Sequence, residues 1–564
     1  MVNLRPMGQP TVAAYTLTRL AQLGLDRVFG VPGDYAFPIN DAAETVPGLS
    51  WVGCANELNA AYAADGYARI RGAAILSTTY GVGELSALNG VMGSNAHRLP
   101  VFHLTGKPSE RIQKLGLLTH HNLGDTVYER FQPLSAAACC VQAVLTPANC
   151  VDELERVIRE ALRQSRPAYL VISEVQALLP VHGQPINGLP LQAIKRQHSV
   201  AEELDAAVAA ILESLERAQR PVAMVTDLVR RYGLRRQAEA FIRKANLPTV
   251  FAPFDKGCLD ESLPQVIGLY AGHESSSPAV RGLVEAADLL VDIGGQVAAD
   301  LNTGGWTARI PSSRRVTVSD DWVRLGDKVF LHTALEDVLS ALVEQVQPRS
   351  GDHGPRLELT PLVGRDGEPL SSVAFTARLQ QRLMAGDTLV IETGTCGLHL
   401  LPMLLPAGVD VELQGLWGSI GWATPACMGV AMAKTSGRAW LVSGDGAHQL
   451  TLNELAVMGR YGVKPVIFVL NNGLYGIEDV LSERGHRYDD LPPVRYHLLP
   501  EAFGCQGWLS EKVATVQELE AVLERIERHD GAAYIEVMIP NEESQPLPAA
   551  TIDQSYKLKT PAVE

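Results

Sequence analysis

The sequence lacks several patterns that mark common classes of protein. Its eight cysteines are scattered and include no Cys-x-x-Cys pair, so we expect free thiols in a reducing cytosol and neither a disulfide framework nor a zinc site. It contains no Walker loop. Its two Gly-x-Gly sequences, at residues 81–83 and 444–446, lack the third glycine of the dinucleotide-binding fingerprint. Because these motifs are absent, the sequence gives no reason to expect a nucleotide site or a structural zinc site.

Basic charge and long apolar runs are also scarce. The chain has 48 Lys and Arg against 63 Asp and Glu, a formal net charge of −15, which argues against nucleic acid or an anionic membrane as a partner. No apolar run approaches the length that spans a membrane, and the first residues show no apolar region typical of a secretion signal. We therefore expect a cytoplasmic protein that binds neither nucleic acid nor membranes.

The apolar sequence that is present suffices for several domains. Hydrophobic residues make up 46% of the 564 positions, and two segments rich in Pro, Gly and polar residues, 179–198 and 346–371, indicate linkers. They predict three domains, at residues 1–185, 198–348 and 370–564. Helix and strand patterns alternate in each, which predicts an α/β protein with three doubly wound parallel sheets. The clearest elements are a helix at 11–23 and strands at 27–30, 221–226, 288–294 and 388–393.

Asp445 and Asn472 each follow a predicted strand. The strands, at 438–443 and 464–470, flank a predicted helix at 449–461. This is the arrangement of one right-handed βαβ crossover. We therefore expect both residues side by side at the carboxyl ends of parallel strands, where open α/β sheets bind ligands.

The residue types at this edge suit a metal ion and a diphosphate. Gly444 and Gly446 let the main chain approach a phosphate, and the following helix offers its N-terminal N–H groups. Asp445, the Asn472 amide oxygen and a nearby main-chain carbonyl are hard oxygen ligands, which hold Mg²⁺ when phosphate oxygens complete the octahedron. Either motif alone could be an ordinary turn, but both together at crossover spacing favour the metal site.

Four further polar groups are candidates on weaker grounds. Glu57 opens a helix whose flank is almost all alanine, so its carboxylate is expected to be buried and to need a partner. It could instead complement the helix dipole. His120 and His121 lie in a loop and could be solvated, and Asp34, at a strand-to-helix turn, could be an N-cap. The residues alone leave these alternatives open.

A set of motifs runs nearly from end to end of the chain: Val31-Pro-Gly-Asp-Tyr, Trp51-Val-Gly-Cys-Ala-Asn-Glu-Leu-Asn-Ala, Thr79-Tyr-Gly-Val-Gly-Glu-Leu-Ser, His120-His121, Leu416-Trp-Gly-Ser-Ile-Gly-Trp, Gly444-Asp-Gly and Ile477-Glu478. Together they resemble the thiamine-diphosphate-dependent 2-keto acid decarboxylases, the group that contains pyruvate, indolepyruvate, phenylpyruvate and branched-chain keto acid decarboxylases. The Glu-Leu-Asn and Gly-Val-Gly-Glu-Leu-Ser stretches resemble indolepyruvate decarboxylases most closely. The paired histidines are specific to these decarboxylases within the larger thiamine family.

The resemblance implies a pyrimidine-binding first domain, a middle domain and a diphosphate-binding third domain, with thiamine diphosphate and Mg²⁺ as cofactors. It implies that a 2-keto acid is decarboxylated without oxidation to an aldehyde and CO₂, through an enamine on the cofactor. Active sites in this family lie between subunits. The resemblance therefore also implies a homodimer or homotetramer whose only other partner is a small keto acid.

The resemblance also assigns roles to individual positions. Glu57 would hydrogen-bond the aminopyrimidine ring, and Ile420 would hold the cofactor in its bent form. Mg²⁺ would be bound by Asp445, Asn472 and the carbonyl of Leu474. The remaining cofactor-binding positions would be Thr393, Gly418, Ser419, Gly444 and Gly446. The proton-relay cluster would consist of Asp34, His120, His121 and Glu478.

Some positions depart from the family pattern. Leu474 stands where the family usually has Gly, and Gly476 where it usually has Thr, so a left-handed backbone at Leu474 would be strained. His448 follows the Gly-Asp-Gly motif, and we predict a structural role for it. The segment 546–556 lacks the clear amphipathic helix that usually covers the active site.

The substrate pocket is predicted to be wide. Gly397 and Leu398 stand where pyruvate decarboxylases are similar in presenting bulky aromatics, and Leu301 likewise replaces an aromatic. Ile477 and Leu481 would supply aliphatic walls. Each methylene that a larger substrate buries there contributes roughly 0.8 kcal/mol. We therefore predict a preference for long, branched or aromatic keto acids, such as indolepyruvate, phenylpyruvate or 2-ketoisovalerate, over pyruvate.

Three alternatives compete with this prediction. The first is a pyruvate decarboxylase, if backbone shifts or the C-terminal segment refill the pocket. The second is a flavin-containing, thiamine-dependent carboligase similar to acetohydroxyacid synthase, against which the pair His120-His121 argues. The third is a non-catalytic protein on the same scaffold, which is disfavoured because Glu57, Asp445 and Glu478 are all present.

Overall fold

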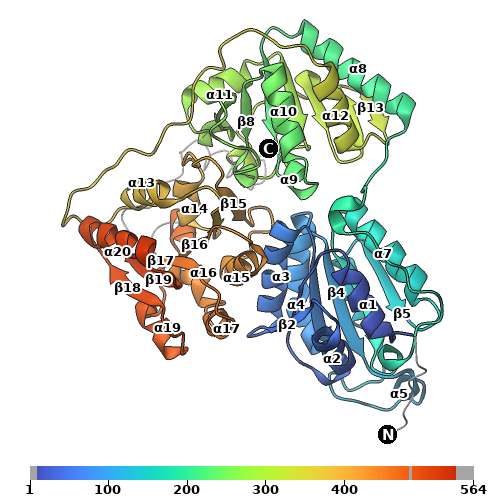
Figure 1. The fold of residues 1–564 in the computed structure, drawn as a ribbon. Coiled ribbons are helices and arrows are strands. Elements are labelled where there is room, and N and C mark those ends of the chain that lie inside the picture. Colours follow the sequence, from blue (N-terminus) through green and yellow to red (C-terminus); the bar gives the residue numbers. More distant parts are fainter. Residues whose placement is uncertain (1–8, 482–484, 541–564) are drawn as a thin grey trace, which may run out of the picture.

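The computed structural model describes residues 9–481 and 485–540 and contains three α/β units, each built on one sheet (Figure 1). The first and third units lie next to each other, and the middle unit sits above both in the view of Figure 1. The prediction of an α/β fold with three mostly parallel sheets is confirmed. The domain boundaries inferred from the linkers stay predictions.

The first unit has a six-stranded parallel sheet in the order β2-β1-β3-β4-β6-β5. Its central strands are buried along their whole length, as expected when helices cover both faces. The strands are β1 (Arg27–Gly30), β2 (Ser50–Gly53), β3 (Ala74–Thr79), β4 (Val101–Lys107), β5 (Val141–Leu145) and β6 (Ala168–Ser173). The helices are α1 (Val12–Ala21), α2 (Phe37–Thr45), α3 (Glu57–Arg71), α4 (Val82–Ala96), α5 (Glu110–Lys114), α6 (Gln132–Ala137) and α7 (Cys150–Gln164).

The middle unit has a seven-stranded sheet in the order β13-β12-β11-β10-β7-β8-β9. β12 pairs antiparallel with both of its neighbours, β11 and β13, whereas the other pairs are parallel. A two-residue turn at Gly326 (φ 55°) joins β12 to β13 as a hairpin. The strands are β7 (Pro221–Val225), β8 (Thr249–Phe251), β9 (Val266–Leu269), β10 (Leu289–Ile293), β11 (Arg315–Val318), β12 (Trp322–Leu325) and β13 (Lys328–Leu331). The helices are α8 (Ala201–Arg217), α9 (Leu228–Arg231), α10 (Arg235–Ala245), α11 (Pro278–Glu285) and α12 (Leu335–Gln345).

The third unit repeats the first topology, with a parallel sheet in the order β15-β14-β16-β17-β19-β18. The strands are β14 (Thr388–Ile391), β15 (Asp410–Leu413), β16 (Ala439–Gly444), β17 (Val466–Asn471), β18 (Leu509–Val513) and β19 (Ala533–Met538). The helices are α13 (Ser372–Arg382), α14 (Thr395–Leu400), α15 (Ala423–Ala433), α16 (Asp445–Gln449), α17 (Glu454–Arg460), α18 (Gly476–Leu481), α19 (Leu499–Ala502) and α20 (Val516–Arg528).

The prediction of a single helix at 449–461 is wrong. The chain becomes helical at Asp445, directly after β16, and a second helix begins only at Glu454. Between them the buried Thr451 hydroxyl donates a hydrogen bond to the Gly421 carbonyl, 2.7 Å away. The chain is thus held against the loop that precedes α15, which an apolar pattern cannot predict.

The two predicted linkers differ in structure. The first stays attached to the first unit, since Val12 N donates to Leu179 O (2.9 Å) and Val181 N donates to Pro10 O (3.0 Å). The second linker, whose residues 346–371 are all described, runs from α12 to α13 and contains no helix or strand of its own. The segment 546–556 lies outside the described residues. Among the residues that are described, no helix has both the length and the apolar character needed to cross a membrane.

The first and third units are joined by a close crossing of α3 and α15. A Cβ on Gly66 would lie 2.1 Å from Ala426 O, and one on Gly429 would lie 1.9 Å from Ala63 O. Only glycine therefore allows this distance between the two backbones. One hydrophobic core continues across the crossing, because residues of α3 and α15 belong to the same buried cluster.

A buried ionic cluster ties the middle unit to the other two. Glu412 of β15 accepts hydrogen bonds from Arg69 of α3 (3.1 Å) and from Arg231 of α9 (3.2 Å), and it also pairs with Arg230. These guanidinium groups hold the pKa of the buried Glu412 carboxyl at about 2, against the effect of its burial. All three units thus meet at one carboxylate.

The α3–α15 crossing generates a stability prediction. Gly429→Ala should lower the free energy of unfolding by about 1–3 kcal/mol, because the added methyl group overlaps main-chain atoms that cannot rotate away. The matched control is Gly282→Ala in α11, where an added Cβ meets nothing within 4 Å and where replacing Gly in a helix should stabilise by up to about 1 kcal/mol. Urea unfolding measures both. Equal effects of the two substitutions would contradict the crossing.

Candidate active site

Asp445 and Asn472 follow adjacent parallel strands, as predicted. Register places Gly444 at the end of β16 beside Leu470 of β17. Asp445 is buried, and its Oδ1 and Oδ2 accept hydrogen bonds from Gly446 N (3.0 Å) and Gly473 N (2.8 Å). Burial raises the pKa of the Asp445 carboxyl to about 6. A buried carboxylate held only by neutral donors is suited to a cation.

A cavity opens at this edge of the third sheet. It is lined by eight of the predicted positions, namely Thr393, Ile420, Gly444, Asp445, Gly446, Asn472, Leu474 and Ile477. A Cβ on Gly444 would meet nothing within 4 Å, whereas one on Gly446 would lie 2.6 Å from the Tyr475 ring. The main chain is therefore open to a ligand at Gly444. Carboxylate and amide oxygens beside open main chain fit Mg²⁺ and a diphosphate.

The strain expected at Leu474 does not arise. The left-handed residue of this turn is Gly473, at φ 74°, and Leu474 is not among the described residues with positive φ. Leu474 instead forms an isolated bridge with Asp490. The Leu474 N–H donates a hydrogen bond to Asn472 Oδ1, 3.3 Å away. This chain has Gly473 just before the position where the family usually has Gly, and the left-handed backbone lies at Gly473 as well.

The loop before α15 carries Gly418, Ser419 and Ile420. The Ser419 hydroxyl lies 2.7 Å from the Tyr62 hydroxyl of α3, which ties the loop to the first unit. Glu392, at the end of β14, accepts hydrogen bonds from Gly421 N and Ala423 N, both at 3.1 Å. Burial raises the pKa of the Glu392 carboxyl to about 7. Our sequence analysis missed Glu392, although a carboxylate directly after an apolar strand was a visible signal.

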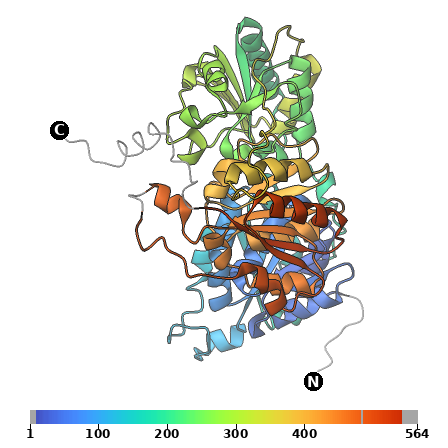
Figure 2. The same ribbon diagram turned by 90° about the vertical axis from the view of Figure 1, so that its left-hand side faces the viewer.

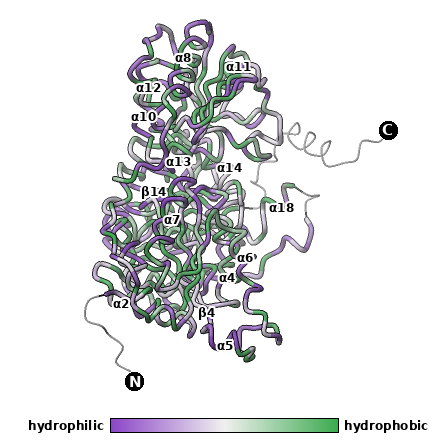
Figure 3. The backbone as a smooth tube through the Cα atoms, turned by 90° about the vertical axis from the view of Figure 1, so that its right-hand side faces the viewer, coloured by the Kyte–Doolittle hydropathy of each residue, from purple (hydrophilic) through white to green (hydrophobic). Residues whose placement is uncertain are grey.

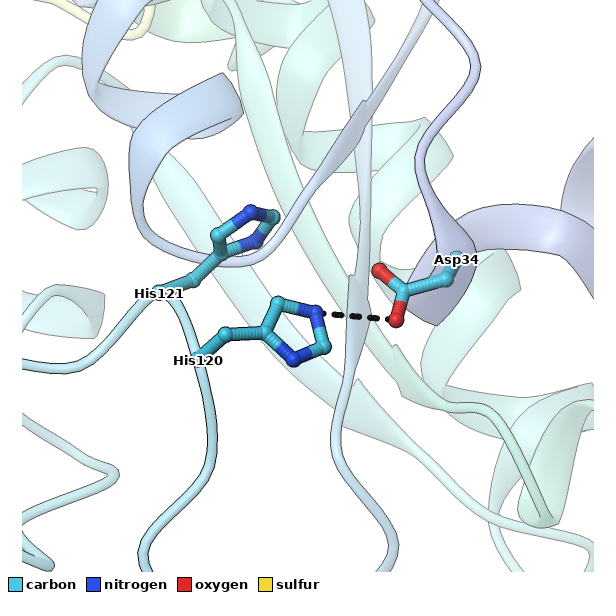
Figure 4. Close-up of side chains that lie close together, drawn as sticks. All are labelled: Asp34, His120 and His121. Carbon is cyan, nitrogen blue, oxygen red and sulfur yellow. Dashed lines mark ion pairs between the residues drawn. The ribbon is translucent and has the colours of Figure 1, made fainter.

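Asp34, His120 and His121 form a separate cluster in the first unit (Figure 4). Asp34 starts the 3₁₀ turn η1 (Asp34–Ala36) after β1, and the histidines lie in the loop that follows α5. His120 Nε2 is 2.9 Å from Asp34 Oδ2. The Tyr35 hydroxyl is 3.4 Å from His120 Nδ1, and the two rings stack with centroids 4.9 Å apart. Both nitrogens of His120 thus face a polar group.

His121 has an unusual backbone. Its φ is 59°, in the left-handed region that a non-glycine residue adopts at a cost. Its ring lies 4.5 Å from that of His120, centroid to centroid. Burial, followed by the neighbouring His120, lowers the pKa of His121. Its Nδ1 is buried and has no hydrogen-bond partner among the described residues. This nitrogen of His121 is therefore available to bind a ligand.

Glu57 is the first residue of α3, whose N-cap, Asn56, accepts a hydrogen bond from Asn59 N at 2.8 Å. The Glu57 carboxylate lies against α4, since a Cβ on Gly83 would be 3.2 Å from Oε1. Nearby, the Asn59 side chain donates to Glu454 Oε2 of α17, 2.7 Å away. Burial raises the pKa of Glu454. This contact between the first and third units was also missed, because it joins residues far apart in the chain.

The described chain does not bring all predicted positions together. Asp34, Glu57, His120 and His121 do not line the cavity in the third unit. Glu478 is exposed on α18. Of the predicted substrate positions, Ile477 lines the cavity, Gly397 is buried in α14, and Leu301, Leu398 and Leu481 are exposed outside it. The predicted site is therefore divided between two separate groups of residues.

His448 has the structural role that we predicted. It is fully buried, with Nδ1 2.8 Å from the Thr424 hydroxyl and Nε2 2.8 Å from the Tyr534 hydroxyl. Burial lowers the pKa of His448 to about 3. The ring is thus neutral, and both of its nitrogens have hydrogen-bond partners in the core.

All eight cysteines are free thiols, as expected.

Comparison with known families identifies the class of protein. Residues 10–129 match the N-terminal TPP binding domain of thiamine pyrophosphate enzymes, residues 208–344 their central domain, and residues 394–537 their C-terminal TPP binding domain. The chain is a thiamine pyrophosphate enzyme. The cofactor predicted from the resemblance, thiamine diphosphate, is thereby confirmed.

Curated relatives narrow the class. The chain is 37% identical to an alpha-keto-acid decarboxylase of Mycolicibacterium paratuberculosis over 94% of each protein, and 35% identical to one of Mycobacterium leprae over 98% of each. It therefore belongs to the family of thiamine-diphosphate-dependent alpha-keto-acid decarboxylases, which are carboxy-lyases. A solved thiamine diphosphate-dependent 4-hydroxybenzoylformate decarboxylase of Rhodococcus jostii RHA1 shares the fold, with a TM-score of 0.77 and 20% identity, over 95% of this chain and 100% of that one.

Asp445 should link the stability of the cofactor-free protein to pH. Its pKa of about 6 in the folded protein lies above the ordinary value of 3.8 for an aspartate. Between about pH 4 and 6 the folded state therefore binds more protons than the unfolded chain, and the free energy of unfolding falls as pH rises through this window. Asp445→Asn lacks this titration. The difference in stability should shift in the variant's favour by roughly 2–3 kcal/mol between about pH 4 and pH 7.

Urea unfolding of the cofactor-free protein at several pH values measures this difference. The control is Asp366→Asn in the exposed segment between α12 and α13, whose difference from wild type should stay constant with pH. A constant difference for Asp445→Asn as well would show that Asp445 does not titrate as described.

Proposed function

We propose that the protein decarboxylates larger 2-keto acids, branched or aromatic ones such as 2-ketoisovalerate, phenylpyruvate or indolepyruvate, and releases the corresponding aldehyde. The observation that carries this proposal is Gly397. It lies in α14 next to Cys396, which lines the cavity, and a Cβ built on it would meet nothing nearer than 3.6 Å. Ile477 adds an aliphatic side chain to the cavity wall. Small and aliphatic groups here leave room for a large substrate side chain.

The third unit would hold the cofactor through its diphosphate and metal ion. Asp445, Asn472 and the Leu474 carbonyl would bind Mg²⁺. The open main chain at Gly444 would receive the diphosphate, with Thr393, Gly418, Ser419 and Gly446 as further contacts. Thiamine diphosphate held there would supply an acceptor for the electron pair released in decarboxylation. The fit rests on the buried carboxylate and the open backbone at Gly444.

The remaining residues would position the cofactor and move protons. Ile420, which lines the cavity, would contact the cofactor and fix its position. The Glu57 carboxyl would hold a proton against the pyrimidine ring. His120 Nε2 would exchange a proton with the substrate while Asp34 Oδ2, 2.9 Å away, fixes the ring. Neutral His121 and Glu478 would complete the relay from opposite sides.

We also propose that a second copy of the chain completes each site, in a cytoplasmic homodimer or homotetramer. The support for this proposal is exposed apolar surface around the loop that carries His120 and His121. Five residues of the segment 115–127 that surrounds the two histidines are between 47% and 68% exposed: Leu115, Leu117, Leu118, Leu123 and Val127. Figures 2 and 3 show α5 and α18 on the same side of the molecule. Apolar surface of this kind is typical of an interface.

Glu57→Gln tests the catalytic assignment. Turnover of phenylpyruvate should fall by more than about a hundredfold, because the amide cannot exchange a proton with the pyrimidine. Binding of Mg²⁺ and thiamine diphosphate, measured by calorimetry, should change little. The control is Glu44→Gln, an exposed position in α2, which should keep wild-type activity. Near-normal turnover in Glu57→Gln would refute the assigned role.

Gly397→Trp tests the substrate preference. The indole should fill the space proposed for a large side chain, so kcat/KM for phenylpyruvate and indolepyruvate should fall at least tenfold more than kcat/KM for pyruvate. Gly397→Ala, whose Cβ fits without a clash, is the matched control and should keep the wild-type preference. An equal loss on every substrate, or a wild type that already prefers pyruvate, would support the pyruvate decarboxylase alternative.

A further inference from the structure

We propose that Asp34, His120 and His121 form a binding site for a transition-metal ion such as Zn²⁺, separate from the Mg²⁺ site, and that occupation of this site excludes the keto acid. The two imidazole rings extend from one loop toward the Asp34 carboxylate on η1 (Figure 4). One ligand atom from each residue lies within 4.8 Å of the others. The metal site stands on this geometry alone, whereas the competition with keto acid rests on the proposed function.

The ligand set selects the kind of ion. Two imidazole nitrogens and one carboxylate oxygen suit Zn²⁺, Ni²⁺ or Co²⁺, whereas Mg²⁺ prefers the oxygen ligands at Asp445. Three protein ligands leave the fourth position of a tetrahedral zinc ion open to water. Ligand atoms around zinc lie about 3.4 Å apart. His120 Nε2 and Asp34 Oδ2 are 2.9 Å apart, and the three ligand atoms lie within 4.8 Å of one another, so shifts of about an ångström complete the site. The exposed side chains of His120 (56%) and Asp34 (44%) have room to do this.

The surroundings already hold His120 as a metal ligand requires. A ligating imidazole is usually fixed through its second nitrogen. His120 meets this condition, because its Nδ1 lies 3.4 Å from the Tyr35 hydroxyl while Nε2 faces Asp34. His121 offers a buried Nδ1 that has no hydrogen-bond partner among the described residues. Its left-handed backbone at φ 59° turns the ring beside that of His120.

The charge of the cluster also favours a divalent ion. Asp34 contributes a carboxylate, with Oδ2 2.9 Å from His120 Nε2. A carboxylate oxygen attracts a divalent cation, and imidazole nitrogens offer it lone pairs. Because His120 is proposed to exchange a proton with the substrate and Asp34 to fix its ring, an ion bound to both residues blocks both roles at once.

The experiment is a calorimetric titration of Zn²⁺ into the holoenzyme, in the presence of excess Mg²⁺ and thiamine diphosphate. Wild type should bind one Zn²⁺ per chain. His120→Gln, His121→Gln and Asp34→Asn should each weaken binding by more than about tenfold, since each removes one of three ligands. His198→Gln, at an exposed histidine away from the cluster, should bind Zn²⁺ as wild type does. Tyr35→Phe keeps all three ligands and should cause a smaller loss.

Activity supplies the second measurement. With wild-type enzyme, Zn²⁺ should inhibit decarboxylation, added keto acid should raise the concentration needed for half inhibition, and EDTA followed by Mg²⁺ should restore activity. Equal Zn²⁺ binding by wild type and all three ligand variants would overturn the metal site. Binding lost in the variants but without inhibition of wild type would overturn the competition. A wild type inactive on every keto acid would instead refute the proposed function, and the titration would still test the site.

Discussion

The close crossing of α3 and α15 is the constraint on which the rest of the arrangement depends. Gly66 and Gly429 let two helices from different units approach until main-chain atoms touch. The N-terminus of α3 carries Glu57, and the loop that leads into α15 carries Gly418, Ser419 and Ile420. One packing contact therefore fixes the relation between the first unit and the cavity edge of the third. Contacts such as Tyr62 to Ser419 and Asn59 to Glu454 lie along the same boundary.

Buried charge is the second constraint. Asp445, Glu392 and Glu454 are carboxylates in the interior whose pKa values burial raises. Glu392 accepts hydrogen bonds from main-chain N–H groups, and Glu454 accepts one from the Asn59 amide at Oε2. Asp445 faces the cavity, where a metal ion would neutralise it. The cofactor-free protein thus carries an electrostatic cost at the position where a cation would bind.

Local patterns predicted much of the fold and the cofactor site. Apolar strands ending in Gly-Asp-Gly and Asn-Asn located the crossover, because parallel strands bring their carboxyl ends to one edge. Family motifs located Asp34, His120 and His121, which the structure brings together. The break between α16 and α17 could not be predicted, since it depends on Thr451 reaching Gly421. The same holds for the left-handed turn at Gly473, which depends on backbone geometry, and for the hydrogen bonds that Glu392 accepts from residues distant in sequence, although its position after a strand could have been noticed.

The two groups of predicted residues lie in different units, and their union in one site between two chains is the central claim. It is tested most directly by mixing two inactive variants, Glu57→Gln and Asp445→Ala, under conditions in which subunits exchange. A mixed dimer contains one site with both native halves, so an equal mixture should recover about a quarter of wild-type activity. A mixture that stays inactive, although mass analysis shows mixed dimers, would contradict a shared site.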